Sequence, residues 1–207
     1  MQPFFQTLTD IDFKSGLGEI IKFNIIADAG QGFDDIFDSI GGLLKRDNGL
    51  VDRFVEASLA FKRKFIEEDE FDRGERIKLN FAHTFGHAVE VVSEYEIPHG
   101  TAVAIGTVMA NYVSYLRGML SETTRIKTEA LLLRVIDIDA AVTDFNIEKI
   151  IDAMKKDKKQ VDVNITAVLL EDAGAKDLVI VHDVTASEIR EAVAHFVKIN
   201  TRSLEGV

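Results

Sequence analysis

The spacing of hydrophobic and polar positions predicts a chain made mainly of helices. Only two prolines interrupt its 207 residues, and apolar side chains recur at helical intervals. We expect the first helices at about 15–27, 34–45, 50–67, 74–94, 100–118, 122–134 and 146–157. The run Ala102–Ala110 is apolar and too short to span a bilayer. It therefore predicts a helix buried in the core.

The pattern changes near the C-terminus and predicts a β-hairpin followed by a helix. Val163–Leu170 and Asp177–His182 are apolar or β-branched runs separated by a turn sequence that contains glycine. Thr185–Glu188 is a capping box that opens a last helix reaching about residue 199, and Asn146 caps the helix before the hairpin. The predicted fold is mainly α: a multi-helix domain over 1–207 with a small β-hairpin near the C-terminus.

The composition limits the kinds of molecule that the protein is expected to bind. The formal net charge of −11 argues against binding nucleic acid or an anionic membrane. The absence of cysteine excludes disulfides and thiolate metal sites. Because residues 1–10 lack the pattern of a signal peptide, we expect a cytoplasmic protein. The oligomeric state stays open, with a homodimer as one candidate.

One stripe of polar residues stands out within the predicted helix 74–94. Arg76, Asn80, His83 and His87 follow one another at spacings of four, three and four, which places them on one helix face. His99 follows where that helix should end. A solvated helix face is usually built from lysine and glutamate, so the stripe indicates a functional site.

The spacing of His83 and His87 suits a shared metal ion. The alternative is a pair of inert core histidines, each hydrogen-bonded. Gly86 inside the helix indicates that something packs close to the backbone. His99 lies at a helix start, where free N–H groups attract anions. Together these features favour a functional site.

A second polar pair lies upstream. Ser15 is the predicted N-cap of a helix that carries Glu19 and Lys22 three residues apart. Alone, this would be an ordinary surface ion pair. The flanking apolar residues predict instead a helix buried on nearly all sides, and a buried Glu and Lys need partners such as a metal cation and a phosphate.

The two remaining histidines and one glycine pair are not interpreted as functional. His182 and His195 are interpreted as structural or exposed rather than catalytic. Gly16-Leu-Gly18 follows no predicted strand, so it is not a nucleotide-binding loop.

Five segments together resemble the dehydroquinate synthase family, the sugar-phosphate cyclases. They occur in the family's order and close to its spacing: Gly16–Lys22, Lys62–Glu70, Leu79–Glu90, His99–Gly106 and Asp157–Lys159. The resemblance implies the C-terminal, mainly helical, metal-binding domain of that fold. It also implies an N-terminal NAD-binding domain that is absent from this chain.

The resemblance assigns roles residue by residue. It implies that Glu19, His83 and His99 are the zinc ligands, with cobalt as another candidate metal. It places His87 beside the substrate, where it assists proton transfer, rather than on the metal. The other matched positions, implied to hold the substrate's carboxylate, hydroxyls or phosphate and to take part in catalysis, are Lys22, Lys62, Arg76 and Asn80, with Lys158 or Lys159 at the phosphate.

The implied activity is that of a 3-dehydroquinate synthase, a carbon–oxygen lyase of the shikimate pathway of aromatic amino acid biosynthesis. Such an enzyme eliminates phosphate from a seven-carbon keto-acid phosphate and closes its ring. The implied partners are this anionic sugar phosphate and the NAD-binding domain. Because NAD would be held mainly by the missing domain, we expect the chain alone to be inactive.

Three departures from the family pattern leave the substrate open. Thr101 stands where the family usually has Glu, Ala82 where it has Gly, and Phe23-Asn24 where it has an aromatic residue and Gly. The alternatives are a cyclase of the 2-epi-5-epi-valiolone or 2-deoxy-scyllo-inosose type, a relative of the metal-dependent alcohol and glycerol dehydrogenases, or a non-catalytic metal-binding domain.

Overall fold

The chain forms a mainly helical domain with one small sheet, as predicted. The computed structural model describes residues 5–26, 31–70, 74–138, 145–156, 165–172 and 177–205. Its helices are α2 (Asp10–Ile26), α3 (Gln31–Leu44), α4 (Asn48–Glu68), the 3-10 helix η2 (Glu75–Asn80), α5 (His83–Val92), α6 (His99–Leu116), α7 (Glu122–Leu132), α8 (Ile147–Lys156) and α9 (Ala186–Glu205). The strands are β1 (Ile165–Glu171) and β2 (Asp177–Val184).

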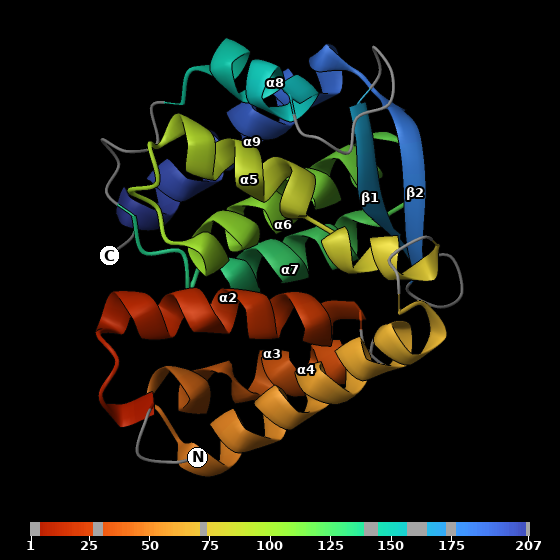
Figure 1. Ribbon diagram of the computed structural model, residues 1–207. Helices are drawn as coiled ribbons and strands as arrows, with labels where there is room; N and C mark the ends of the chain where they lie inside the picture. Colours follow the sequence, from red (N-terminus) through yellow and green to blue (C-terminus); the bar gives the residue numbers. More distant parts are fainter. Residues whose placement is uncertain are drawn as a thin grey trace.

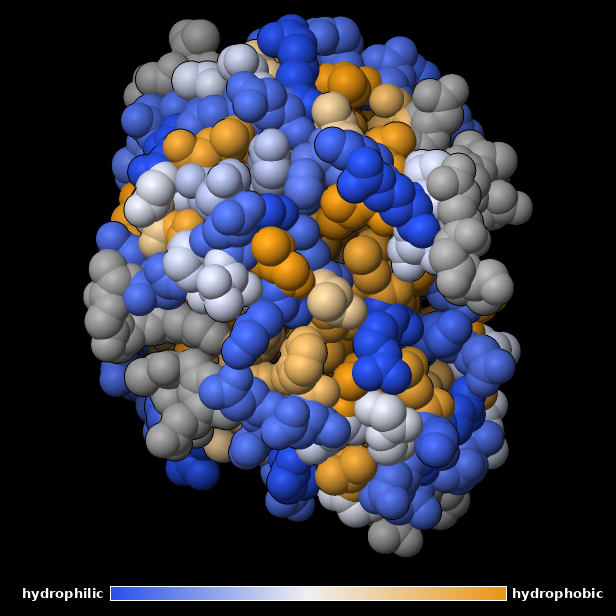
Figure 2. Space-filling view, turned by 180° about the vertical axis from the view of Figure 1, so that it is seen from behind, coloured by the Kyte–Doolittle hydropathy of each residue, from blue (hydrophilic) through white to orange (hydrophobic). Residues whose placement is uncertain are grey.

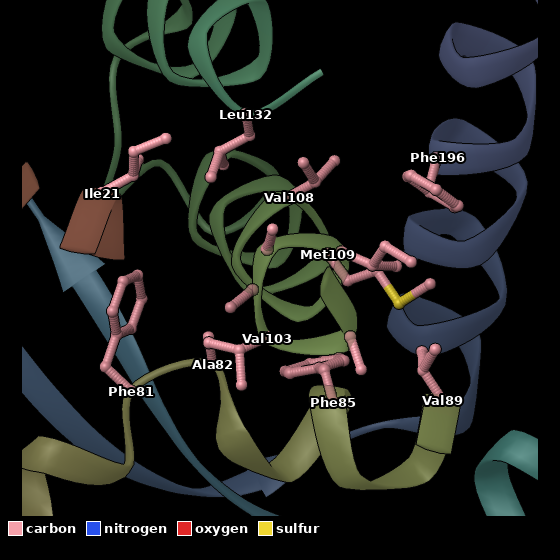
Figure 3. Packing of buried hydrophobic residues seen from close by; sticks show 14 of the residues in the cluster. Ile21, Phe81, Ala82, Phe85, Val89, Val103, Val108, Met109, Leu132 and Phe196 are labelled. Carbon is pink, nitrogen blue, oxygen red and sulfur yellow. The ribbon is translucent and has the colours of Figure 1, made fainter. Parts of the chain in front are cut away.

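Helix α6 is the centre of the core. Every residue from 100 to 111 is buried, because this stretch is apolar or small on all sides, and the predicted buried helix is confirmed. Figure 3 shows Phe85 of α5, Leu132 of α7 and Phe196 of α9 packed around α6, beside Met109 of α6 itself. An all-apolar helix is stable only when neighbours cover its whole circumference.

Helix α2 lies between two groups of helices. In Figure 1 it separates α3 and α4 on one side from α5, α6 and α7 on the other. Its run Ile21–Ile26 is buried throughout, as its apolar sequence predicts. The helix begins earlier than predicted, because Thr9 Oγ1 accepts a hydrogen bond from the Asp12 amide at 3.1 Å.

The predicted N-cap role of Ser15 is therefore wrong. Ser15 lies inside α2, and its hydroxyl oxygen accepts from the Gly100 amide of α6 at 3.0 Å. It satisfies a free N–H at the start of another helix, a tertiary contact that local sequence does not show.

The predicted single helix over 74–94 is also wrong. Helix η2 ends at Asn80 and α5 begins at His83. Between them Ala82 takes a left-handed conformation, with φ of 68°. Helix α6 presses on this break, since a Cβ at Gly106 would lie 2.5 Å from the Ala82 carbonyl oxygen. The stripe of four polar residues is thus divided between two elements.

The C-terminal predictions are confirmed. Strands β1 and β2 pair antiparallel with an irregularity between Ile165 and Ala167. In the capping box, the Thr185 amide donates to Glu188 Oε2 at 2.8 Å and the Glu188 amide donates to Thr185 Oγ1 at 3.3 Å. Asn146 Oδ1 accepts from the Lys149 amide at 3.2 Å at the start of α8.

One face of the molecule is mainly polar. Figure 2 shows a mostly hydrophilic face, with hydrophobic residues gathered in patches near its middle. Among the described helices, none combines the length and apolar character that crossing a bilayer requires.

Candidate metal and anion site

Three helices meet at the predicted site. Glu19 comes from α2, His83 from α5 and His99 from the first turn of α6. Two glycines allow the backbones of α2 and α6 to touch, since a Cβ at Gly18 would lie 2.2 Å from the Gly100 carbonyl oxygen. Each glycine directly precedes or follows a site residue, so the close crossing brings Glu19 against His99.

The side chains of Glu19, His83 and His99 converge on one point. Glu19 Oε1 lies 3.6 Å from His83 Nε2 and 3.7 Å from His99 Nε2. One ligand atom from each of the three residues lies within 4.8 Å of the others. Such a triad of two imidazoles and a carboxylate is a ligand set typical of zinc in enzymes.

One oxygen of the Glu19 carboxylate lacks a hydrogen-bond donor. Glu19 Oε1 is buried and has no hydrogen-bond partner, although Oε2 contacts Lys22 Nζ at 3.0 Å. A buried anionic oxygen without a donor is unfavourable. A metal cation between this oxygen and the two Nε2 atoms would satisfy it, so the residues present fit a metal ion.

The opposite ring nitrogens of both histidines are engaged. His83 Nδ1 lies 3.2 Å from the Phe81 carbonyl oxygen, which the break before α5 turns toward it. His99 Nδ1 lies 3.0 Å from Glu90 Oε1. Because a carboxylate accepts, His99 Nδ1 acts as the donor to Glu90, and His99 Nε2 presents its lone pair toward Glu19. At His83, Nδ1 faces both the Phe81 carbonyl oxygen and the Lys22 ammonium group, which lies 3.4 Å away, while Nε2 faces Glu19.

The geometry does not favour a metal shared by His83 and His87. Their rings stand edge to face at a centroid distance of 5.3 Å. Within the described ranges, the second set of three metal-binding side chains is His87, Glu90 and His99. Neither set contains both His83 and His87.

A pocket of about 200 Å³ opens beside Glu19 and His83, and His99 does not line it. Its lining includes three cationic side chains from three different elements. The lining residues are Glu19, Lys22, Phe23, Lys62, Arg76, Leu79, Asn80 and His83. The structure thus brings together most of the predicted substrate-binding residues in one place.

The other predicted residues lie elsewhere. His87 does not line this pocket, but it contacts His83 and lies 6.0 Å from His99 between ring centroids. Lys158 and Lys159 lie outside the described residues. His182 is exposed on β2, and His195 contacts Glu129 at 2.7 Å.

Burial shifts the protonation of two residues in the site. Lys22 is 1% exposed, and burial lowers the pKa of its ammonium group, opposed by Glu19 and assisted by Lys62. Burial, followed by the nearby charge of Lys22, lowers the pKa of His83 to about 4. His83 is therefore neutral at physiological pH, as a metal ligand must be.

This shift predicts a loss of stability in acid. Between pH 6.5 and about 4 the unfolded chain protonates His83 and the folded chain does not, so the free energy of unfolding falls as pH falls through this range. The full effect is roughly 3 kcal/mol. Urea unfolding in the presence of a chelator should show a shallower pH dependence for His83→Asn than for wild type. An NMR titration that placed the His83 pKa near 6.5 would contradict the prediction.

Two groups that contact the histidines of the site, the Phe81 carbonyl and the Glu90 carboxylate, are not predicted by the sequence analysis. The Phe81 carbonyl depends on the break before α5, which no local pattern predicts. Glu90 had a signal, because it lies three residues after His87 on the same face of α5. Two departures from the family pattern, Ala82 and Thr101, are buried and do not line the pocket.

Comparison with known proteins identifies the family of the chain. The sequence profile of the family described as "3-dehydroquinate synthase C-terminal" matches residues 16–160. The chain belongs to the 3-dehydroquinate synthase family. The enzyme of that name from Geobacter sp. (strain M21) is 37% identical over 170 residues, which are 82% of this chain and 46% of the relative. The 3-dehydroquinate synthase of Clostridium perfringens (strain 13 / Type A) is 33% identical, covering 81% of this chain and 47% of the relative.

Solved structures of two other synthases have the same fold as this chain. A 2-epi-5-epi-valiolone synthase from Streptomyces hygroscopicus subsp. jinggangensis 5008, solved with NAD+ and Zn2+, superposes with a TM-score of 0.78 at 23% identity over 95% of this chain and 54% of its own. A 2-deoxy-scyllo-inosose synthase, solved with carbaglucose-6-phosphate, NAD+ and Co2+, superposes with a TM-score of 0.70 at 19% identity, over 91% of this chain and 53% of its own. The chain spans about half the length of the relatives it matches.

Proposed function

We propose that this chain is the metal- and substrate-binding half of a 3-dehydroquinate synthase, which eliminates phosphate from a seven-carbon keto-acid phosphate and closes its ring. One observation carries the proposal. The ligand atoms of Glu19, His83 and His99 lie within 4.8 Å of one another, and Glu19 and His83 also line the pocket that holds Lys22, Lys62 and Arg76. A metal site beside a cluster of cations suits an anionic, hydroxyl-bearing substrate.

Glu19, His83 and His99 would hold the metal, zinc or cobalt. When bound, the ion supplies Lewis-acid polarisation of a substrate hydroxyl. Glu19 is well suited to the task because its free oxygen is already desolvated. Three protein ligands are the number that catalytic zinc sites use.

The surrounding residues of the chain would bind and orient the substrate. Arg76 is anchored by its Nη1, which donates to the Glu70 carbonyl oxygen at 2.9 Å, so its guanidinium group is held in place. Lys62 is exposed on α4 and can reach a charged group of the ligand. Asn80 lines the pocket and can donate to a hydroxyl or phosphate oxygen. His87, next to His83, would move a proton at the substrate.

The proposed reaction also requires NAD, which another part of the enzyme would bind. No glycine-rich nucleotide loop occurs in the sequence. The matched relatives are about twice as long as the aligned region. We therefore expect NAD to be bound mainly by an N-terminal domain that pairs with this one.

A substrate panel tests the proposed function. The chain is supplied with an NAD-binding half and assayed for phosphate release and for accumulation of NADH. The proposal predicts phosphate release from the seven-carbon keto-acid phosphate without net NADH. Turnover of neutral sugar phosphates alone would indicate a cyclase of the valiolone or inosose type. Net NADH formation would indicate a dehydrogenase, and metal binding without turnover a non-catalytic domain.

Removing one cationic side chain from the pocket should weaken the binding of the transition state. In the assembled enzyme we expect Lys62→Ala and Arg76→Ala each to lower kcat/KM by about tenfold or more, because a charge-assisted contact contributes about 1.5–3 kcal/mol. Neither change should alter metal content, since neither side chain belongs to the ligand set.

The control for these two variants is Arg63→Ala. Arg63 follows Lys62 on α4, but its side chain is 77% exposed and pairs with Glu67. This control removes the same charge away from the pocket and should leave kcat/KM nearly unchanged. Equal losses of kcat/KM in Lys62→Ala and Arg63→Ala would mean that the overall electrostatic field of the protein, and not a contact inside the pocket, explains the effect.

A further inference from the structure

Glu90 contacts His99 from the opposite side of the ring to Glu19. It lies on α5 seven residues after His83 and three after His87, on the face that carries both histidines. Its Oε1 is 3.0 Å from His99 Nδ1, while Glu19 Oε1 is 3.7 Å from His99 Nε2. The two carboxylates thus face the two ring nitrogens of the same imidazole.

His99 depends on this contact more than His83 depends on any single contact. The His83 side chain is 18% exposed and is enclosed by its surroundings, whereas that of His99 is 49% exposed. Helix α6 begins at His99, and the preceding Pro98 makes no side-chain capping hydrogen bond. Within the described part of the chain, Glu90 is the side chain within hydrogen-bond distance of the His99 ring. A half-exposed ring at a helix start is free to rotate unless a partner fixes it.

We propose that Glu90 is a positioning residue for the metal ligand His99, an inference that rests on the proposed metal centre. Its carboxylate accepts the Nδ1–H of His99. This contact selects the tautomer whose Nε2 carries the lone pair, and it holds that lone pair toward Glu19 and His83. Because the Glu90 side chain is only 13% exposed, water competes weakly for the hydrogen bond.

The size of the effect follows from other metal centres. Carboxylates that hold the second nitrogen of a ligating histidine typically raise metal affinity by about 10–100-fold. Glu90→Ala should therefore weaken zinc binding by this factor. Glu90→Gln keeps an oxygen that can accept the same N–H, and we expect it to bind zinc within about threefold of wild type, since the hydrogen bond rather than the charge sets the tautomer.

Glu96→Ala is the matched control. Glu96 lies in the loop before His99, is exposed, and its side chain has no hydrogen bond or ion pair to another described residue. The control removes the same charge near the same histidine. Zinc affinity is measured for the full chain by competition with a chromophoric chelator, with the unfolding midpoint recorded for each variant.

A second measurement needs no metal. Imidazole 15N shifts of the metal-free chain, at a pH where His99 is neutral, report which nitrogen carries the proton. Wild type and Glu90→Gln should show His99 protonated at Nδ1, and Glu90→Ala should shift toward the Nε2–H form. A structural role alone would move the unfolding midpoint without moving this tautomer.

Several outcomes would overturn the inference. Glu90→Ala could bind zinc as tightly as Glu96→Ala, or keep the wild-type tautomer. Two bound ions in wild type, one of them lost in Glu90→Ala, would make Glu90 a ligand of a second site with His87 and His99. Failure of wild type to bind zinc would sink the metal centre itself, and the metal-free tautomer measurement separates that failure from a failure of the Glu90 contact.

Discussion

Gly18→Ala is expected to destabilise the chain and to damage the site, whereas Gly16→Ala, two residues away on the same helix, is expected to stabilise it. The added Cβ at position 18 would lie 2.2 Å from the backbone oxygen of Gly100. A backbone atom cannot turn aside as a side chain can, so α2 must move away from α6. Overpacking of this kind costs about 1–3 kcal/mol, occasionally more.

The displacement should reach Glu19 and His99, two of the proposed metal ligands. Gly18 is joined to Glu19, and Gly100 to His99, so separating the two helices pulls Glu19 Oε1 away from His99 Nε2. We expect zinc affinity to fall by at least tenfold in Gly18→Ala, because ligands must hold their geometry to within about half an ångström. The measurements are urea unfolding and metal competition on the full chain.

Gly16 provides the control because it lies in α2 with nothing within 4 Å of an added Cβ. Alanine there reduces the freedom of the unfolded chain and raises helix propensity, adding about 0.4–1 kcal/mol. Similar destabilisation by both substitutions would show that the Gly18–Gly100 approach does not hold the two helices in place.

The parts of the fold that follow from local pattern were predictable. The apolar run of α6 predicts its burial because no charged side chain interrupts it, and its Thr107 hydroxyl donates to the Val103 carbonyl oxygen of the same helix. The capping box of Thr185 and Glu188 predicts the start of α9 because both hydrogen bonds are formed within four residues. The antiparallel hairpin likewise follows from two short apolar runs and a turn sequence.

The parts that depend on tertiary contacts were not predictable from those patterns. Ala82 adopts a conformation that L-residues rarely take, and no local signal marks it. The break exists together with the close approach of Gly106 on another helix. The sequence around Ser15 is typical of an N-cap, yet its hydroxyl oxygen accepts a hydrogen bond from the amide of Gly100, which is far away in the chain.

The candidate site shows the same division. Helical spacing alone placed His83 and His87 on one metal, whereas the geometry pairs His83 with Glu19 and His99. The ligand set came from the family resemblance, since no spacing rule joins residues 19, 83 and 99. The contact of Glu90 with His99 needs the two helices α5 and α6 side by side, and it appears only in three dimensions.

The second large effect concerns the metal. His99→Ala should lower zinc affinity by more than a hundredfold, because it removes one of three ligands and leaves two. His87→Ala should leave zinc affinity nearly intact, because His87 is absent from the set formed by Glu19, His83 and His99. The two variants remove the same side chain within one cluster of three rings, so each is the control for the other.

Metal content after equilibrium dialysis against zinc, measured by elemental analysis, gives the comparison. We expect about one zinc per chain in wild type and His87→Ala, and little in His99→Ala at the same free zinc concentration. Unchanged stoichiometry in His99→Ala, or loss of zinc in His87→Ala, would reverse the assignment of ligands.

The most direct measurement is a crystal structure of the chain grown with zinc, with anomalous diffraction recorded at the zinc absorption edge. We expect one strong anomalous peak at about 2.0–2.2 Å from Glu19 Oε1, His83 Nε2 and His99 Nε2. We also expect Glu90 to stay on His99 Nδ1. A peak bound by His83 and His87 instead, or no peak between these three side chains at saturating zinc, would contradict the proposed metal centre.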